Sequence, residues 1–391
     1  MAMAKFLPEG RGLLERVRGL PVARPLLAAD HVYLVGGAVR DLLLGGAPVD
    51  LDLVVEGDAE QYARSLGGRL TGHDRFGTAS VVLDGHTYDI ARSRRETYAH
   101  PGALPEVEPA PLAEDLGRRD FTVNAIALAL GDGELIAAPG ALEDLEGRRL
   151  RVLHDRSFID DPTRLFRLVR YASRLAFAIE PHTLSLANAA IEGGALGTIS
   201  GPRIGAELRL LAREEDPVAG FIGLRELRLD RAVDPGFGLD DEALARRALE
   251  LLPADARGDR LVLAVAGRRV PAAELGRLLD GMAFEAEDRD AIVVAAAQAP
   301  SEIAAAAADA PAELVAVAGA LGPERQARDW LGQLRHVRLS IDGRDLLAAG
   351  VAEGPAIGRG LRAALAAKLD GHALGREQEL AEALNAAGGS Q

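Results

Sequence analysis

The chain of 391 residues contains no cysteine. This absence excludes disulfide bonds, zinc sites with thiolate ligands and cysteine nucleophiles. The sequence also lacks any window of 18 uncharged apolar residues, and its first ten residues lack the apolar run of a secretory signal. We therefore expect a cytoplasmic protein that has no membrane partner.

Lysine is almost absent, because only Lys5 and Lys368 occur and nearly every cation is an arginine. The 45 basic residues are outnumbered by 59 Asp and Glu residues, which gives a formal net charge of −14. This balance argues against non-specific binding of nucleic acid. The hydrophobic content of 48% and the charged content of 27% are typical of a globular protein. The length allows about two to four domains.

Patterns of strands and helices alternate before about residue 148, which predicts an α/β region. Residues 93–114 contain several prolines and are predicted to form a long mobile loop. The other predicted elements are strands at 31–35, 50–55, 79–83 and 87–91 and helices at 38–44 and 58–66.

Strand patterns become rare after residue 148. Residues 161–177 predict a helix, because Pro162 suits a first helical turn and Asp160 or Asp161 can cap it. From about residue 201 to the end, stretches rich in alanine and leucine predict an array of helices. Residues 301–320 fit either a helix or a low-complexity spacer.

Asp50 and Asp52 are the first candidates for a functional site. Residues i and i+2 of a strand point to the same face, and two carboxylates there repel each other unless a cation lies between them. Mg²⁺ takes oxygen ligands and commonly joins carboxylates to substrate phosphates. An isolated pair of this kind more often lies on a solvated strand edge. The neighbouring residues must therefore show whether this pair binds a metal.

The surroundings of this pair favour a phosphate and metal site. Gly36 and Gly37 lie between a predicted strand and a predicted helix, where backbone N–H groups can approach phosphate oxygens, and Arg40 adds a cation. Asp89 places a third carboxylate in another predicted strand, with a structural role as the alternative. Three carboxylates on neighbouring strands suit two-metal chemistry, in which one ion activates a hydroxyl and the other stabilises leaving pyrophosphate.

The segment GGAVRDLLLGGAPVDLD at residues 36–52 resembles the signature of the class II tRNA nucleotidyltransferase and bacterial poly(A) polymerase family. Residues 118–125 (RRDFTVNA) resemble a second motif of that family, and the resemblance covers residues 31–213. It implies an α/β polymerase-β-like head with a small mixed sheet, followed by an all-α neck, body and tail. The expected boundaries are 1–147 for the catalytic head, 148–215 for the neck that recognises the nucleobase, 216–336 for the body and 337–391 for a tail that contacts tRNA.

The resemblance also implies roles for individual residues. Asp50 and Asp52 would hold Mg²⁺ and activate the 3′ hydroxyl of the RNA, with Asp89 as a less constant third carboxylate. The other implied contacts are Gly36, Gly37 and Arg40 with the triphosphate, and Arg119, Asp120 and Asn124 with the ribose and phosphates of the incoming nucleotide.

The helix predicted at 161–177 has an apolar face and, opposite to it, a row of Arg164, Arg167, Arg170 and Arg174. Four arginines without a carboxylate on their own face would repel one another, so RNA or a triphosphate is expected beside them. A solvated amphipathic helix is the alternative.

In the family, an acid-acid-x-x-Arg motif at the start of this helix reads the incoming base, and residues 160–164 (DDPTR) resemble it. Asp161 and Arg164 would then hydrogen-bond to groups that distinguish C and A from U and G, and Arg167 is expected to contact the nucleotide as well.

Residues 148–213 contain eleven arginines and six acids, a local net charge of +5. Affinity for nucleic acid depends on such a local footprint. The local charge therefore permits an RNA partner, and the family resemblance implies the 3′ end of tRNA, CTP and ATP as partners. The glycine-rich turn at 350–359 is expected either to contact the tRNA backbone or to be a plain turn between helices.

The predicted function is template-independent, metal-dependent addition of nucleotides from CTP and ATP to the tRNA 3′ end, in CCA addition or repair, with release of pyrophosphate. The alternatives are an A-adding enzyme, a CC-adding enzyme, a poly(A) polymerase or a catalytically inactive RNA-binding relative.

Overall fold

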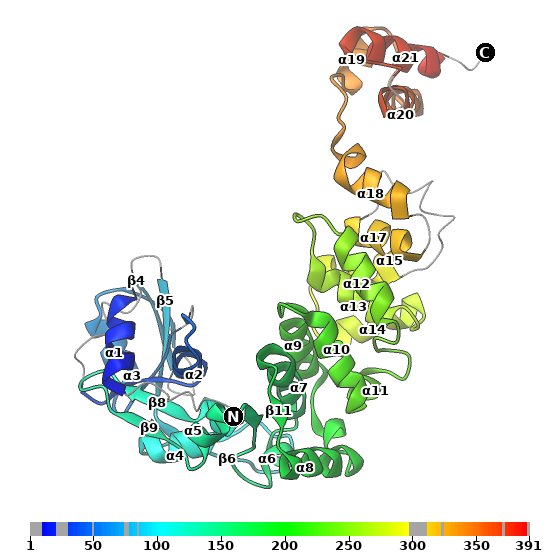
Figure 1. Ribbon diagram of the computed structural model, residues 1–391. Helices are drawn as coiled ribbons and strands as arrows, with labels where there is room; N and C mark the ends of the chain where they lie inside the picture. The colour runs from blue at the N-terminus through cyan, green and yellow to red at the C-terminus, as the bar shows by residue number, and fades with distance from the viewer. Residues whose placement is uncertain are drawn as a thin grey trace, which may run out of the picture. The chain divides into compact units, whose positions relative to one another are not determined.

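The computed structural model describes residues 10–20, 30–48, 51–73, 78–83, 86–296, 311–321, 324–369 and 372–388. The chain divides into two compact units, and Figure 1 labels their helices and strands. The first unit contains Met1–Asp240 and Arg269–Arg289, and the second contains Asp241–Arg268 and Asp290–Gln391. Within the described ranges, no helix is long and apolar enough to cross a membrane.

A seven-stranded mixed sheet forms the centre of the N-terminal part, with the strand order β3-β4-β5-β2-β1-β8-β9. The β2–β5 pair is parallel, and the other neighbouring pairs are antiparallel. The predicted α/β region is thereby confirmed. The strands are β1 (Val32–Val35), β2 (Asp52–Val55), β3 (Arg69–His73), β4 (Thr78–Leu83), β5 (His86–Arg92), β8 (Ile126–Ala129) and β9 (Leu135–Ala137).

Short helices surround this sheet. Leu112 and Leu116 of α4 pack in one core cluster with Val35, Val54 and Ala127, so α4 covers one face of the central strands. The helices are α1 (Gly10–Gly19), α2 (Gly37–Leu43), α3 (Ala59–Ser65), α4 (Leu112–Gly117) and α5 (Ala141–Glu146), with a 3₁₀ turn η2 (Thr122–Asn124).

The prediction of a long loop at 93–114 is wrong. Strands β6 (Arg94–Thr97) and β7 (Glu106–Pro109) form an antiparallel hairpin, and α4 follows it. Nε and Nη2 of Arg95 donate to Oε2 of Glu108 across the ladder, at 2.9 and 2.6 Å. Both strands are mostly polar and partly exposed, so they lack the alternating apolar pattern on which strand prediction depends.

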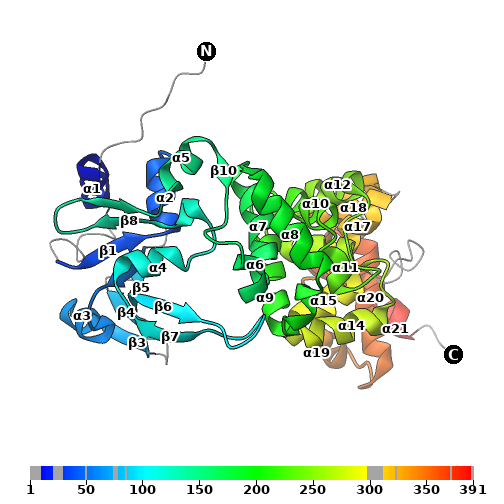
Figure 2. The same ribbon diagram turned by 90° about the horizontal axis from the view of Figure 1, so that it is seen from below.

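Helices form most of the remainder of the first unit. Helix α7 (Thr163–Leu175) confirms the long helix that the sequence predicts, and it packs against α9 and α10. Figure 2 shows the β6–β7 hairpin extending from the sheet towards α6 and α9. The elements are β10 (Arg149–Leu150), α6 (Ser157–Asp160), β11 (Ala178–Ile179), α8 (Pro181–Glu192), η3 (Ala195–Thr198), α9 (Gly201–Ala212), α10 (Pro217–Glu226), α11 (Asp230–Val233) and α14 (Ala272–Gly281).

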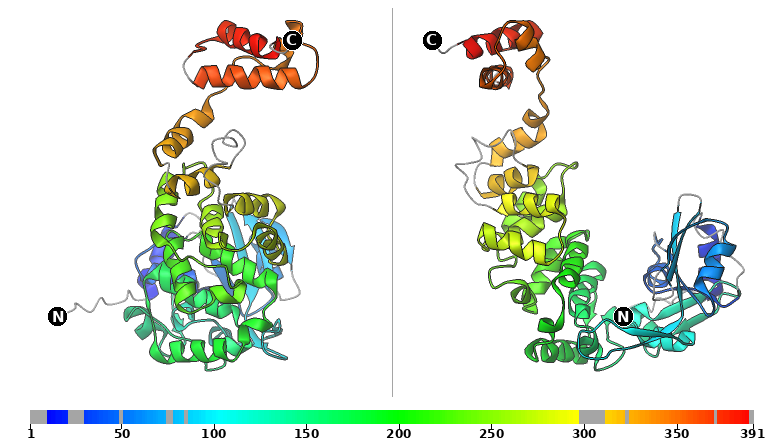
Figure 3. Two further views of the ribbon diagram at one scale, coloured as in Figure 1. Left: turned by 90° about the vertical axis from the view of Figure 1, so that its right-hand side faces the viewer. Right: turned by 180° about the vertical axis from the view of Figure 1, so that it is seen from behind.

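The second unit is helical where it is described. Helices α19, α20 and α21 form a small cluster of their own around Leu346, Ala364 and Ala383 (Figure 3). Of the segment 301–320, residues 301–310 lie outside the described ranges, and the rest belongs mostly to α17. The elements are α12 (Glu242–Leu251), α13 (Gly258–Gly267), α15 (Ala286–Ala296, which begins in the first unit), α17 (Ala312–Leu321), α18 (Glu324–Gly332), η4 (Leu334–His336), α19 (Gly343–Ala348), α20 (Pro355–Leu369) and α21 (Arg376–Gly388).

A mixed-sheet region followed by helices confirms the predicted fold class. The four predicted domain boundaries stay a prediction.

Candidate active site

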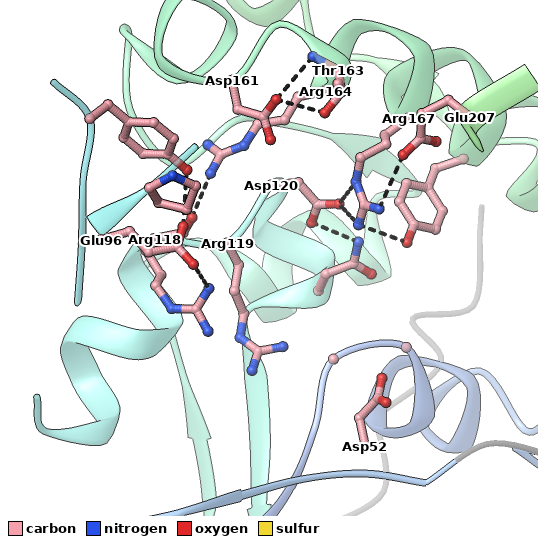
Figure 4. Close-up of a pocket in the computed structure, with 16 residues that line it drawn as sticks. Asp52, Glu96, Arg118, Arg119, Asp120, Asp161, Thr163, Arg164, Arg167 and Glu207 are labelled. Atoms are coloured by element: carbon pink, nitrogen blue, oxygen red, sulfur yellow. Dashed lines mark hydrogen bonds and ion pairs between the residues drawn. The ribbon is translucent and has the colours of Figure 1, made fainter. Parts of the chain in front are cut away.

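A cavity of about 370 Å³ lies in the first unit, between the turn that follows β1 and helix α7 (Figure 4). Its walls come from segments that are far apart in the sequence, including the β6–β7 hairpin, the segment after α4, and α9. The lining residues are Gly36, Gly37, Asp52, Glu96, Tyr98, Pro105, Arg118, Arg119, Asp120, Asn124, Asp161, Thr163, Arg164, Arg167, Tyr171 and Glu207.

Most of the predicted site residues therefore meet at this cavity. Arg40 and Asp89 are not among its lining residues. Asp50 lies outside the described residues. The predicted residues that line the cavity are Gly36, Gly37, Asp52, Arg119, Asp120, Asn124, Asp161, Arg164 and Arg167.

Gly36 forms the sharp turn between β1 and α2. Its backbone has φ +68° and ψ −130°, a conformation that residues with a side chain rarely adopt. A Cβ atom at this position would lie 2.9 Å from Nη1 of Arg119. The turn therefore requires glycine, and a side chain at this position would also displace the guanidinium of Arg119.

Arg40 lies behind the wall of the cavity, with only 1% of its surface exposed. Its Nη1 donates to Oδ1 of Asn124 at 2.5 Å, and its Nη2 lies 2.8 Å from Oδ1 of Asp41. Its guanidinium carbon lies 5.4 Å from the centre of the Tyr171 ring. Arg40 therefore supports Asn124, which does line the cavity.

The carboxylates of Asp52 and Asp89 occupy neighbouring strands. The two residues are register partners in the parallel β2–β5 pair, so their side chains share a face of the sheet, on neighbouring strands that lie about 4.8 Å apart. The hydroxyl of Ser80 donates to Oδ1 of Asp89 at 2.6 Å. This all-oxygen donor set fits Mg²⁺, which prefers carboxylates. Among the residues that the structure describes, which exclude Asp50, no group of three or more potential ligands converges.

Asp120 is a buried carboxylate at the centre of the cavity wall. Its Oδ1 accepts from Nδ2 of Asn124 at 3.0 Å and from the backbone N–H of Phe121 at 2.8 Å. Its Oδ2 accepts from Arg167. Burial by itself would raise the pKa of Asp120, but the charge of Arg167 and these hydrogen bonds lower it from 3.8 to about 2. Asp120 is therefore ionised at neutral pH.

Asp161 precedes α7 in an extended conformation, with φ −132° and ψ 92°. Its Oδ1 accepts from the N–H of Thr163 at 3.1 Å, from the hydroxyl of Thr163 at 2.6 Å and from Nη2 of Arg203 at 2.7 Å. Nη1 of Arg203 also donates to the carbonyl oxygen of Gly102 at 2.9 Å. The orientation of Asp161 is thus fixed by α7, α9 and the loop of the hairpin together.

Arg164 lies in the first turn of α7 and is 5% exposed. Its Nη1 donates to the hydroxyl of Ser157 at 2.6 Å, and its Nη2 donates to the carbonyl oxygen of Arg118 at 2.7 Å. These two contacts hold the guanidinium at the cavity next to Asp161, as Figure 4 shows.

The projection of α7 predicts a row of arginines without a carboxylate beside them. This prediction is wrong for Arg170 and Arg174. The guanidinium of Arg170 lies 3.3 Å from Glu207 and 3.7 Å from Glu214, and that of Arg174 lies 3.7 Å from Glu214. Arg170 is also only 6% exposed. Carboxylates on α9 and just after it supply the expected anion, and a projection of a single helix cannot include them.

Several lining residues were not predicted as site residues. Tyr171 lies one helical turn after Arg167, and its ring centre lies 5.5 Å and 4.9 Å from the guanidinium carbons of Arg167 and Arg170. This position could have been predicted from the sequence, because residues four apart on a helix lie on the same face. Glu207 carries no such local signal, because its contact with the arginines depends on how α9 packs against α7. The other unpredicted lining residues are Glu96, Tyr98, Pro105, Arg118 and Thr163.

Comparisons with known proteins agree with this geometry. Residues 32–151 match the poly A polymerase head domain family. The chain is 45% identical over 229 residues to an A-adding tRNA nucleotidyltransferase of Geobacter sulfurreducens, a match that covers 56% of this chain and 26% of that protein. It is 37% identical over 353 residues to a CC-adding tRNA nucleotidyltransferase of Deinococcus radiodurans, covering 85% of this chain and 83% of that protein.

Among solved structures, the fold is similar to that of the Thermotoga maritima CCA-adding enzyme complexed with tRNA. The TM-score is 0.74 at 29% identity, and the match covers 96% of this chain and 98% of that one. The chain spans only about a quarter of the length of the Geobacter relative. The Deinococcus relative, in contrast, is matched over 83% of its length. The chain therefore belongs to the tRNA nucleotidyltransferase family, which includes the CCA-adding enzymes.

Proposed function

We propose that the protein transfers nucleotidyl groups from CTP and ATP to the 3′ end of tRNA without a nucleic-acid template, and so completes or repairs the terminal CCA. The observation that carries this proposal is the arrangement of one cavity. Figure 4 shows Asp52 at one end of it and Asp161 with Arg164 at the opposite end, with Arg119 and Asp120 between them. A nucleoside triphosphate placed along it would have its phosphates near Asp52 and its base near Asp161.

At the phosphate end, Gly36 and Gly37 leave room for the triphosphate, and Arg119 supplies a cation. Asp50 and Asp52, with Asp89 on the neighbouring strand, would hold Mg²⁺, which when bound neutralises phosphate charge and lowers the pKa of the attacking hydroxyl. The 3′ hydroxyl of the tRNA loses its proton to solvent, and its oxygen forms a bond to the α-phosphorus of the nucleotide. The bond from that phosphorus to the bridging oxygen breaks, and pyrophosphate leaves.

In the middle of the cavity, Asp120 and Asn124 would orient the ribose and phosphates of the nucleotide. The structure gives Arg40 and Arg167 partners of their own, Asn124 for the first and Asp120 for the second. We therefore propose that Arg40 acts by holding Asn124 in place. We also propose that Arg167 contacts the nucleotide while it stays paired with Asp120.

At the base end, Asp161 and Arg164 would form hydrogen bonds with the edge of the incoming base. One oxygen of Asp161 is already occupied by Thr163 and Arg203, which leaves Oδ2 to accept from an exocyclic amine. C and A carry such an amine, so this end would select CTP and ATP. A site built to pair with these groups rejects bases that leave them unpaired.

We propose that each of the four predicted segments has its own role. Residues 1–147 would carry the catalytic head, 148–215 the neck that reads the base, 216–336 the helical body and 337–391 a tail that contacts tRNA. The relatives named above differ in the nucleotides they add, so the same machinery also fits an A-adding enzyme, a CC-adding enzyme or a poly(A) polymerase.

The experiment that tests the proposal supplies labelled CTP or ATP to the purified protein with tRNA transcripts that lack the whole terminal CCA, its last two nucleotides or only its final A. Incorporation of both C and A supports CCA addition. Addition of C alone or of A alone identifies a partial activity, and long tails of A identify a poly(A) polymerase. Absence of incorporation from every nucleotide on every transcript would overturn the proposal.

A further inference from the structure

The carboxylate of Asp115 is fully buried behind the cavity and does not line it. Asp115 is on α4, three and four residues before Arg118 and Arg119, and none of its surface is exposed. Its Oδ1 accepts from Nε and Nη2 of Arg118, at 3.0 and 2.7 Å. Its Oδ2 accepts from Nη2 of Arg119, at 2.9 Å. Each oxygen of one carboxylate therefore holds one guanidinium.

Arg118 and Arg119 both line the cavity, and each has a second contact there. The side chain of Arg119 reaches Gly36. Its Nη1 lies 2.9 Å from the position that a Cβ atom would have if Gly36 carried a side chain. Its Nε is buried and has no hydrogen-bond partner within the described part of the chain. The contact with Asp115 therefore determines the direction of a cation at the phosphate end.

Arg118 connects the same carboxylate with further residues that line the cavity. Its Nη1 donates to Oε1 of Glu96 at 2.6 Å, and the hydroxyl of Tyr98 donates to Oε2 of Glu96 at 2.9 Å. Asp115 thus supports Glu96 and Tyr98, which line the cavity, through the side chain of Arg118.

We propose that Asp115 is a positioning residue for the incoming nucleotide, because it holds Arg119 beside Gly36 at the phosphate end and holds Arg118, whose partner Glu96 also lines the cavity. This inference rests on the proposed function. Two adjacent arginines repel each other, and a charged acceptor placed between them fixes both side chains before the ligand binds. Burial by itself would raise the pKa of Asp115, but the charges of Arg119 and Arg118 lower it, so the carboxylate is ionised when it acts.

The test compares Asp115→Asn with Asp259→Asn in steady-state incorporation of C and A into tRNA. Asp259 is a matched control, because its largely buried carboxylate also accepts from an arginine, Arg257, and neither residue lines the cavity. Both variants are expected to lose thermal stability. Asp115→Asn alone should raise the KM for the nucleotide by roughly tenfold, as expected for loss of one charge-assisted hydrogen bond, with a smaller change in kcat and an unchanged Kd for tRNA.

A double-mutant cycle separates positioning from general destabilisation. If Asp115 acts through Arg119, the combined variant Asp115→Asn with Arg119→Gln should raise the nucleotide KM little more than Arg119→Gln does alone. If Asp115→Asn does not fold, Asp115→Glu keeps the charge but displaces both guanidiniums, and it should raise KM in the same way.

An unchanged nucleotide KM in a folded Asp115 variant, an equal rise in Asp259→Asn, or full additivity in the cycle would each overturn the inference while leaving the proposed function intact. Failure of the wild-type protein to incorporate any nucleotide would instead overturn the proposed function, and this inference with it.

Discussion

Arg167 and Asp120 form a doubly hydrogen-bonded ion pair, in which Nε and Nη2 of the arginine donate to one oxygen of the carboxylate at 2.9 and 2.5 Å. Both residues are predicted nucleotide contacts, and the structure shows them as partners of each other. The pair joins α7 to the segment that follows α4, so it holds two walls of the cavity together.

Replacement of Asp120 by Asn should destabilise the protein by about 2 kcal/mol near neutral pH, the free energy that corresponds to a pKa lowered from 3.8 to about 2. Because the pKa is lower in the folded chain, this contribution is present above the unfolded pKa and is lost as the pH falls towards about 2. The melting temperature of the wild type should therefore fall more steeply than that of Asp120→Asn between about pH 5 and about pH 3. Parallel curves for the two proteins would contradict the pairing.

Replacement of Gly36 by Ala should weaken nucleotide binding, because the new methyl group would lie against Nη1 of Arg119. We expect a rise in nucleotide KM of about tenfold, together with a loss of about 1–3 kcal/mol of stability from the strained backbone. Gly133→Ala is the matched control, since Gly133 has a similar φ of +81° but does not line the cavity. An equal rise in KM in both variants would show that strain alone is responsible.

Replacement of Asp52 by Ala should abolish nucleotide transfer while tRNA binding survives. The carboxylate is proposed to hold the ion that activates the hydroxyl, so its loss should lower kcat by at least about 100-fold. Asp132→Ala, which removes a carboxylate from the turn between β8 and β9, is the control for the loss of one negative charge. Turnover close to that of the wild type in Asp52→Ala would refute the metal assignment.

Replacement of Arg164 by Ala should relax the choice of base more than it weakens tRNA binding. Loss of one specific hydrogen-bonding side chain should lower discrimination against UTP and GTP by about tenfold, measured as the ratio of kcat/KM values. Arg174→Ala is the matched control, because Arg174 lies on the same helix but does not line the cavity. Undiminished discrimination in Arg164→Ala would show that this residue does not read the base.

The local features of the site could be predicted from the sequence because each depends on neighbours in the chain. Gly36 and Gly37 between an apolar run and a helix pattern predict the turn after β1, and the structure has it. The apolar periodicity after Pro162 predicts α7. The hairpin at residues 94–109 escaped prediction, since its strands are mostly polar and a cross-strand ion pair joins them in place of an apolar face.

The sequence by itself determined the fold class and the family resemblance, and that resemblance implied most of the predicted residues that line the cavity. Only the tertiary structure decided how the charges are paired. Arg170 meets Glu207 from 37 positions away, and Arg167 meets Asp120 from 47 positions away. Such partners depend on how helices and strands pack, so the periodicity of one element cannot show whether an arginine faces the ligand or another part of the protein.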